Sequence, residues 1–175
     1  MEYRFAPLTL RSLDELKTEV LCLSVFSDER PLRGAAGLVD WRLCGRLSEL
    51  LVSGQLTGAF DQALLMPPPP RRLSAERVFC LGAGSRLALD EGRFRTLTQR
   101  LVARVLALRV RTAAIALPHA SVPGLDPVRA IDLLLEQTLT CSERFDELVL
   151  IDTSEAQRVM EPRIDRARRR AEADL

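Results

Sequence analysis

A glycine-rich segment, Gly82-Ala83-Gly84-Ser85, follows the apolar stretch RVFCL and has the composition of a phosphate-binding turn. Glycine lets the backbone approach a ligand closely, and backbone N–H groups near a helix start attract anions. A dinucleotide-binding fingerprint would need a third glycine where Leu87 stands, and the Gly-Lys-Ser/Thr of a P-loop is missing. We interpret the segment first as a strand-ending turn and keep ligand binding as the alternative.

His119 is the single histidine of the chain and follows an apolar stretch in the sequence LPHASVPG. One histidine makes a zinc site only with cysteine or carboxylate partners, and none lies near it in sequence. A Ser-His-Asp arrangement with Ser121 or Ser85 stays open, although no G-x-S-x-G elbow is present. His119 is interpreted as a loop histidine, with ligand contact beside the glycine turn as the alternative.

Other charged residues have simpler explanations. Asp90 and Glu91 precede a helical pattern, where acidic side chains cap a helix and complement its dipole. Arginines at positions 93, 100, 104 and 111 share one helix flank without interleaved aromatic residues, which indicates a solvated flank and disfavours nucleic-acid binding. The sequence therefore predicts no catalytic residue, no metal site and no cofactor.

The composition predicts one cytoplasmic globular domain. The chain has 175 residues, 47% of them hydrophobic and 28% charged, and a formal net charge of +1. No apolar run reaches membrane-spanning length, and charges interrupt the first twenty positions, which disfavours a signal peptide. The four cysteines stand apart in apolar segments and are expected to be reduced, buried thiols: Cys22, Cys44, Cys80 and Cys141.

Strand-like and helix-like stretches alternate along the chain. We expect strands at 5–10, 19–26, 62–66, 77–81, 112–117 and 147–151, and helices at 36–51, 90–108, 127–138 and from 154 onward. The first two strands, separated by a polar break at 11–16, are expected to pair as neighbours, and Pro162 to interrupt or kink the last helix. This order predicts a three-layer α/β/α domain with a mixed, mostly parallel central sheet.

Several of these segments together resemble the amino-terminal domain of the leucyl aminopeptidase family. They are EVLCLSVF, the stretch from RGAAGLVDW to ALLM, RVFCLGAGS, TAAIALP and ERFDELVLID, within residues 19–152. The resemblance implies a macrodomain-like fold that lies outside the metallopeptidase domain and helps to shape a hexamer.

The resemblance also implies that catalysis belongs elsewhere. In that family, the metal ions and the signature Asn-Thr-Asp-Ala-Glu-Gly-Arg-Leu belong to a carboxy-terminal domain; residues 90–93 (DEGR) echo only part of it. Macrodomains bind ADP-ribose through an asparagine-rich loop and a triple-glycine stretch, and this chain contains no asparagine.

We therefore expect a macrodomain-like domain at 1–152 and an arginine-rich helix at 153–175, where a linker to a catalytic domain would begin. The leading hypothesis is a non-catalytic, stand-alone interaction or assembly module that self-associates or binds a protein partner. The first alternative is a binder of a small nucleotide or ADP-ribose-like ligand at Gly82, Ala83, Gly84, Ser85 and His119. The second is a regulatory subunit or fragment of a metallo-aminopeptidase whose catalytic chain is encoded separately.

Overall fold

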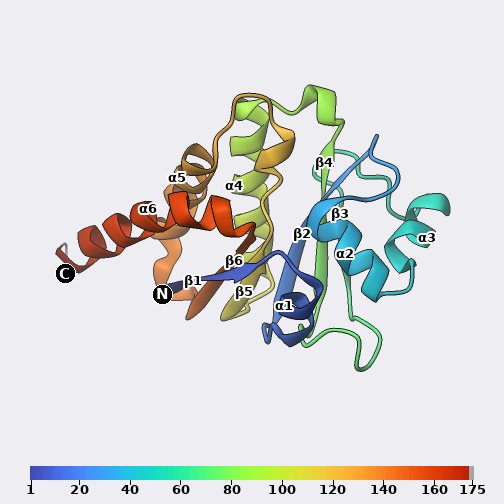
Figure 1. Ribbon diagram of the computed structural model, residues 1–175, viewed down its shortest axis with the longest axis horizontal. Helices are drawn as coiled ribbons and strands as arrows, with labels where there is room; N and C mark the ends of the chain where they lie inside the picture. Colours follow the sequence, from blue (N-terminus) through green and yellow to red (C-terminus); the bar gives the residue numbers. More distant parts are fainter. Residues whose placement is uncertain (174–175) are drawn as a thin grey trace.

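The computed structural model describes residues 1–173 and contains a six-stranded sheet of order β1-β6-β5-β2-β4-β3 (Figure 1). All neighbouring pairs are parallel except β3 and β4, which are antiparallel. The strands are β1 (Glu2–Pro7), β2 (Val20–Phe26), β3 (Ala63–Met66), β4 (Val78–Gly84), β5 (Thr112–Ile115) and β6 (Glu147–Asp152). The expected mixed, mostly parallel sheet is confirmed.

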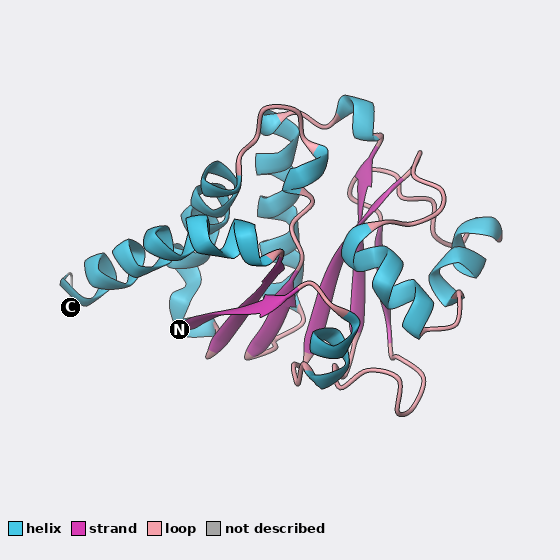
Figure 2. Cartoon of the chain, viewed as in Figure 1, coloured by secondary structure: helices cyan, strands magenta, loops and turns pink. Residues whose placement is uncertain are grey.

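Helices cover both faces of this sheet, so the predicted three-layer α/β/α architecture is also confirmed (Figure 2). One layer contains α1 (Leu10–Glu15), α2 (Gly34–Arg42) and α3 (Arg46–Val52); the other contains α4 (Glu91–Ala107), α5 (Pro127–Thr138) and α6 (Ser154–Ala173). Short 3₁₀ turns follow β4, β5 and α5: η1 (Arg86–Ala88), η2 (His119–Ser121) and η3 (Leu139–Arg144).

Strand β2 shows why the sheet is buried on both sides. Successive strand side chains point to opposite faces, so Leu21 and Leu23 pack with the layer of α1–α3, whereas Val20 and Cys22 pack with α4–α6. A strand between two helical layers reads as a nearly continuous apolar run, as β2 does. The two apolar cores hold the helices against the two faces of the sheet.

The amino-terminal region differs from the sequence prediction. The first strand ends at Pro7, and the expected polar break is helix α1, whose N-cap Thr9 accepts a hydrogen bond from Ser12 N at 3.2 Å. Burial of Leu13 stabilises this short helix against the sheet. Because α1 forms a crossover rather than a hairpin turn, β1 lies at the edge beside β6 and does not pair with β2.

The helix expected at 36–51 is two helices, α2 and α3. The chain turns sharply at Cys44 and Gly45, which have φ of 57° and 82°, and glycine tolerates such a conformation. Asp40 stabilises the break, because its carboxylate accepts hydrogen bonds from Leu47 N at 2.7 Å and Ser48 N at 3.0 Å. Gly54, shortly after the end of α3, has a φ of 75°, the left-handed conformation in which many helices end.

Two further expectations need correction. The expected interruption of the last helix is wrong, because α6 continues through Pro162, whereas the alternative of a kink there stays a prediction. Pro162 removes only the hydrogen bond to the carbonyl of Arg158; both residues are exposed, so water can replace it. Cys22 and Cys80 are buried as expected, and burial raises the pKa of the Cys80 thiol to about 12. Cys44 is exposed, however, because it occupies the turn between α2 and α3, and Cys141 is only partly buried.

The carboxyl-terminal helix packs against the sheet layer. Its apolar face is buried at Ala156, Met160, Ile164 and Ala167. The proposed boundary between residues 152 and 153 stays a prediction, and positions 174–175 lie outside the described residues. None of the helices within 1–173 combines the length and apolar character needed to cross a membrane.

Candidate functional site

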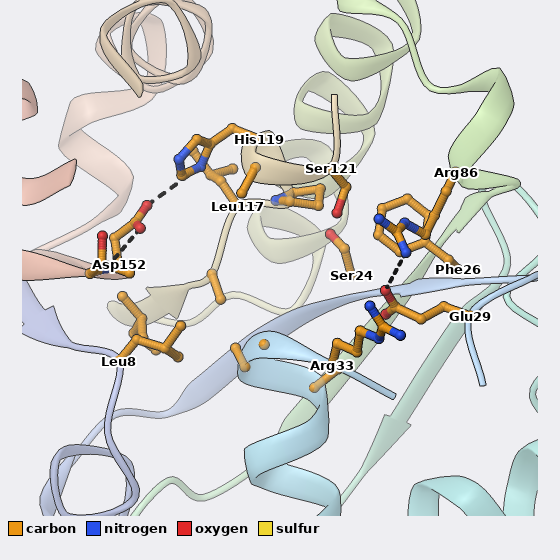
Figure 3. A pocket seen from close by; sticks show the side chains of 18 residues that line it. Leu8, Ser24, Phe26, Glu29, Arg33, Arg86, Leu117, His119, Ser121 and Asp152 are labelled. Carbon is orange, nitrogen blue, oxygen red and sulfur yellow. Dashed lines mark hydrogen bonds and ion pairs between the residues drawn. The ribbon is translucent and has the colours of Figure 1, made fainter. Parts of the chain in front are cut away.

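A groove of about 280 Å³ opens at the carboxyl ends of β2, β5 and β6 (Figure 3). Strands β2 and β5 are parallel neighbours, yet the helices that follow them, α2 and α5, lie in opposite layers. Ligands of open α/β sheets bind at such a topological switch point. The volume is near the lower end of the range for small-molecule sites, roughly 300 Å³.

The amino terminus of α2 forms one wall of the groove. Residues Gly34, Ala35 and Ala36 line it, and the N-cap residue Arg33 makes no side-chain capping hydrogen bond. Gly34 has a φ of 54°, and a Cβ there would meet no atom within 4 Å, so the backbone is open at this point. Free N–H groups and the helix dipole make this wall attractive to an anion.

Arg86 and Glu29 form the end of the groove near β4. Arg86 Nη1 lies 3.4 Å from Glu29 Oε1, and the Glu29 side chain is only 9% exposed. Arg86 Nε is buried without a hydrogen-bond partner. The exposed Arg33 side chain lies beside Glu29 in Figure 3, so two guanidinium groups surround one carboxylate and leave this end cationic.

Hydrogen bonds connect the loop after β2 with the loop after β4 next to Arg86. Asp28 accepts hydrogen bonds from Ser85 Oγ at 2.5 Å and Arg86 N at 2.9 Å. The Ser85 hydroxyl and the Arg86 amide stabilise the ionised form and lower the pKa of the Asp28 carboxyl. This connection fixes the backbone from which the Arg86 side chain enters the groove.

His119 and Asp152 form the opposite end. His119 lies in η2 after β5, Asp152 is the last residue of β6, and their side chains are 7% and 12% exposed. His119 Nδ1 lies 3.4 Å from Asp152 Oδ2 and has no hydrogen-bond partner. Burial raises the pKa of the Asp152 carboxyl, and the nearby His119 and the hydrogen bond from Thr153 N counteract part of that effect.

The structure separates the two site candidates that the sequence singled out. His119 lines the groove, whereas Gly82, Ala83, Gly84 and Ser85 lie beside it and contact it through the next residue, Arg86. The segment is also not a turn, because β4 extends through Gly84. The N–H groups of Gly82 and Gly84 donate to Gln62 O at 2.7 Å and Gly58 O at 2.9 Å, so protein acceptors occupy both.

The remaining candidates have structural partners. Asp90 caps α4, as predicted, by accepting a hydrogen bond from Arg93 N at 2.8 Å. In the arginine flank of α4, Arg100 and Arg104 lie 3.9 and 3.2 Å from the Asp61 carboxylate. Ser121 lines the groove, but no hydrogen bond joins it to His119 within the described chain.

Sequence reasoning missed Asp152, Arg86, Glu29 and the amino terminus of α2. Asp152 had one available signal, because it ends the buried strand ELVLID, at the edge of the sheet where polar side chains reach ligands. Within residues 1–173, no three histidine, cysteine or acidic side chains gather in a geometry that could hold a metal ion.

Comparison with known proteins identifies the relationship. Residues 22–148 match the N-terminal domain of the cytosol aminopeptidase family. The chain belongs to the cytosol aminopeptidase family. The cytosol aminopeptidase of Pseudomonas aeruginosa is 35% identical over 123 residues, which are 70% of this chain and 24% of that protein. A probable cytosol aminopeptidase of Azotobacter vinelandii is 34% identical over 131 residues, or 75% of this chain and 26% of the relative.

Solved structures place this aminopeptidase N-terminal domain in the macrodomain-like fold. A tomato leucine aminopeptidase mutant covers 91% of the chain with a TM-score of 0.60 and 16% identity; the chain covers 35% of it. The Trypanosoma brucei macrodomain in complex with ADP-ribose covers 93% with a TM-score of 0.71 and 13% identity; the chain covers 68% of it. The predicted family resemblance is confirmed, and the domain spans about a quarter of the length of the bacterial relatives above.

Proposed function

We propose that this aminopeptidase N-terminal domain is a non-catalytic binding module whose switch-point groove holds a small phosphate-bearing ligand of the nucleotide or ADP-ribose type. One observation carries the proposal. In the described part of the chain, two buried side-chain polar atoms have no hydrogen-bond partner, and both are nitrogens: Arg86 Nε and His119 Nδ1. Both residues line this groove. Buried polar groups are normally satisfied, so a ligand that supplies partners here would gain free energy.

The charges of the groove favour an anionic ligand. Arg33 and Arg86 stand at one end, and the uncapped α2 amino terminus faces the middle. Macrodomains of the same fold have been solved with ADP-ribose and with ADP. This chain contains no asparagine, so in this proposal arginine side chains and helix amides contact the phosphates.

Isothermal titration calorimetry with ADP-ribose, ADP and inorganic phosphate tests this function. We expect ADP-ribose and ADP to bind, and Arg33→Ala to weaken both by roughly fivefold or more, because a charge-assisted phosphate contact is lost. Arg46→Ala is the matched control, because Arg46 is also exposed but pairs with Glu49 on α3. Absence of binding heat at millimolar ligand would contradict the proposal.

A second function, a protein-interaction or assembly module, is supported by a separate surface. Trp41 on α2 is 65% exposed and lies at a hollow of about 540 Å³ that Pro31, Leu32 and Cys44 also line. Exposed tryptophan is enriched among residues that dominate protein interfaces. In this proposal the occupant is a second copy of the domain or a separately encoded metallopeptidase chain.

Light scattering after size exclusion tests self-association, and affinity capture followed by mass spectrometry tests the peptidase partner. Trp41→Glu is expected to abolish the association. Val52→Glu provides the control, because Val52 is 90% exposed on α3 and does not line the hollow. A monomer that captures no metallopeptidase would argue against this function.

The non-catalytic assignment and a cytoplasmic location are parts of the same proposal. The matched region is the N-terminal domain alone, and the relatives carry the name cytosol aminopeptidase. An assay for release of leucine from a leucyl substrate with added manganese or zinc is expected to show no turnover. Turnover that a chelator abolishes would overturn the assignment.

A further inference from the structure

We infer that the His119–Asp152 end of the groove recognises a planar ligand group that presents a hydrogen-bond donor and an acceptor side by side. An amino-purine edge and a carboxamide on a ring both have this chemistry. The inference rests on the proposed ligand-binding function and assigns one end of the groove to the non-phosphate part of the ligand.

The geometry of the pair leaves both His119 Nδ1 and Asp152 Oδ2 available to hydrogen-bond to such a group. At 3.4 Å, His119 Nδ1 and Asp152 Oδ2 are close enough to attract each other but form no hydrogen bond. Asp152 Oδ1 already accepts from Thr153 N at 2.8 Å, which fixes the carboxylate and leaves Oδ2 for another donor. With its proton on Nδ1, His119 offers a donor beside that acceptor, so a ligand with the complementary pair satisfies both.

The surroundings favour a flat apolar ring. Leu8, Leu117 and Ile151 line the groove beside the pair, and Figure 3 shows Leu8 and Leu117 flanking the space next to Asp152. Ligand sites commonly combine apolar walls with a few polar groups that fix orientation. No arginine lines this end, since Arg33 and Arg86 both lie at the other end of the groove in Figure 3.

The difference in charge between the two ends of the groove orients the ligand. Phosphates are attracted to the α2 amino terminus and the two arginines, whereas the Asp152 carboxylate repels them. A carboxylate accepts an exocyclic N–H instead, and the adjacent imidazole N–H donates to a ring nitrogen or carbonyl oxygen. The ring therefore lies at the His119–Asp152 end, and the phosphate tail extends towards Arg86.

The single histidine makes the test direct, because the imidazole resonances of the ¹⁵N-labelled full chain report His119 alone. ADP tests the amino-purine edge, nicotinamide mononucleotide tests the carboxamide, and purine riboside 5′-diphosphate lacks only the exocyclic amine of ADP. We expect ADP, nicotinamide mononucleotide or both to shift the His119 resonances. If ADP is the ligand, it should bind roughly tenfold or more tightly than the purine analogue, because the analogue leaves the carboxylate unsatisfied.

Asp152→Asn provides the second measurement, because it keeps the side-chain shape and replaces an acceptor oxygen with a donor. We expect it to remove the preference for ADP over the purine analogue. Asp126→Asn is the control: Asp126 caps α5 through Arg129 N at 2.8 Å outside the groove, and asparagine caps equally well.

Three outcomes separate the possibilities. Shifted resonances with a lost preference in Asp152→Asn support the inference. Equal binding of ADP and the purine analogue, with unshifted His119 resonances for every ligand, overturns it and leaves the phosphate-binding function standing. If none of the phosphate compounds binds, the proposed function fails, and the inference fails with it.

Discussion

At the scale of single residues, the Asp152 carboxylate is buried and has few hydrogen-bond partners. The fold leaves its side chain 12% exposed, and its remaining partners are one backbone N–H and an imidazole that does not hydrogen-bond to it. Burial disfavours the ionised carboxylate and raises its pKa. Residues with such pKa shifts gather at functional sites, which agrees with the ligand site proposed for this groove.

The raised pKa of Asp152 predicts the direction in which stability changes with pH. The folded state holds the proton more tightly than the unfolded state, so this residue lowers stability as pH rises from the ordinary carboxyl value, about 3.9, through the raised value. Asp152→Asn removes the buried charge. At pH 8, we expect its Tm to exceed that of the wild type by roughly 2 °C, with no such gain below about pH 3.5.

Differential scanning calorimetry across that pH range checks this prediction. Asp14→Asn is the opposite case, because Asp14 accepts hydrogen bonds from Arg42 Nε and Nη2, both at 2.6 Å. That variant should lower the Tm at pH 8. A lower Tm for Asp152→Asn at every pH would show that Asp152 stabilises the fold.

At the scale of elements, the end of β4 and the loop at residues 57–62 form one unit. Asp61 N donates to Gly82 O at 3.0 Å, and Gln62 Oε1 accepts from Thr57 N at 2.7 Å and Gly58 N at 3.1 Å. The loop carries Asp61 to the arginines of α4. The glycines that suggested a phosphate turn therefore let this loop approach the strand closely.

Gly82→Ala tests that role. A Cβ at this position would lie 1.9 Å from Ala59 O, so the loop backbone must move. We expect a destabilisation of roughly 2–3 kcal/mol, typical of overpacking against a backbone, measured by chemical denaturation.

Gly92→Ala is the matched control in the first turn of α4. The nearest atom to its added Cβ is Asp90 Oδ1 at 3.4 Å. Alanine should be neutral there or stabilise by up to about 1 kcal/mol, because it is the better helix former. Equal stability of the two variants would mean that the loop does not need the glycine.

At the scale of the whole molecule, α6 belongs to the same core as the sheet. Met160 and Ile164 are buried with residues of β1 and α5, and Gln157 Nε2 donates to Ala6 O at 2.8 Å. Arg168 also donates to the carbonyl of Tyr3. These contacts predict that α6 unfolds together with the domain and is not an independent appendage.

Ile164→Ala tests this cooperativity. Removing buried methyl groups should lower the free energy of unfolding by about 2–4 kcal/mol. If the domain unfolds as one unit, the loss appears equally in circular dichroism and in the fluorescence of Trp41, the single tryptophan, which lies in the opposite helical layer. Val159→Ala, at a 45% exposed position on α6, should change stability by less than about 0.5 kcal/mol.

An Ile164→Ala effect confined to circular dichroism, with Trp41 fluorescence unchanged, would contradict cooperative unfolding of α6 with the domain.

Local patterns in the sequence were sufficient to predict elements that depend on interactions between residues close together in the chain. Alternation and apolar runs predicted β2 and the strand at 147–151, and the cap Asp90 marked the start of α4, because capping acts within three residues. Local patterns failed where a contact across the chain decides. Asp40 splits a helix by capping the next one, and α1 separates β1 from β2.

The sequence by itself determined the family, the layered fold and His119 as a candidate. Only the tertiary structure decided what His119 meets, because Asp152 is 33 positions away and reaches it only through the pairing of β5 with β6. Arg86 likewise meets Glu29 only because β4 pairs with β2. A binding site at a switch point combines loops from strands far apart in sequence, and their contacts follow from strand order, which no local pattern encodes.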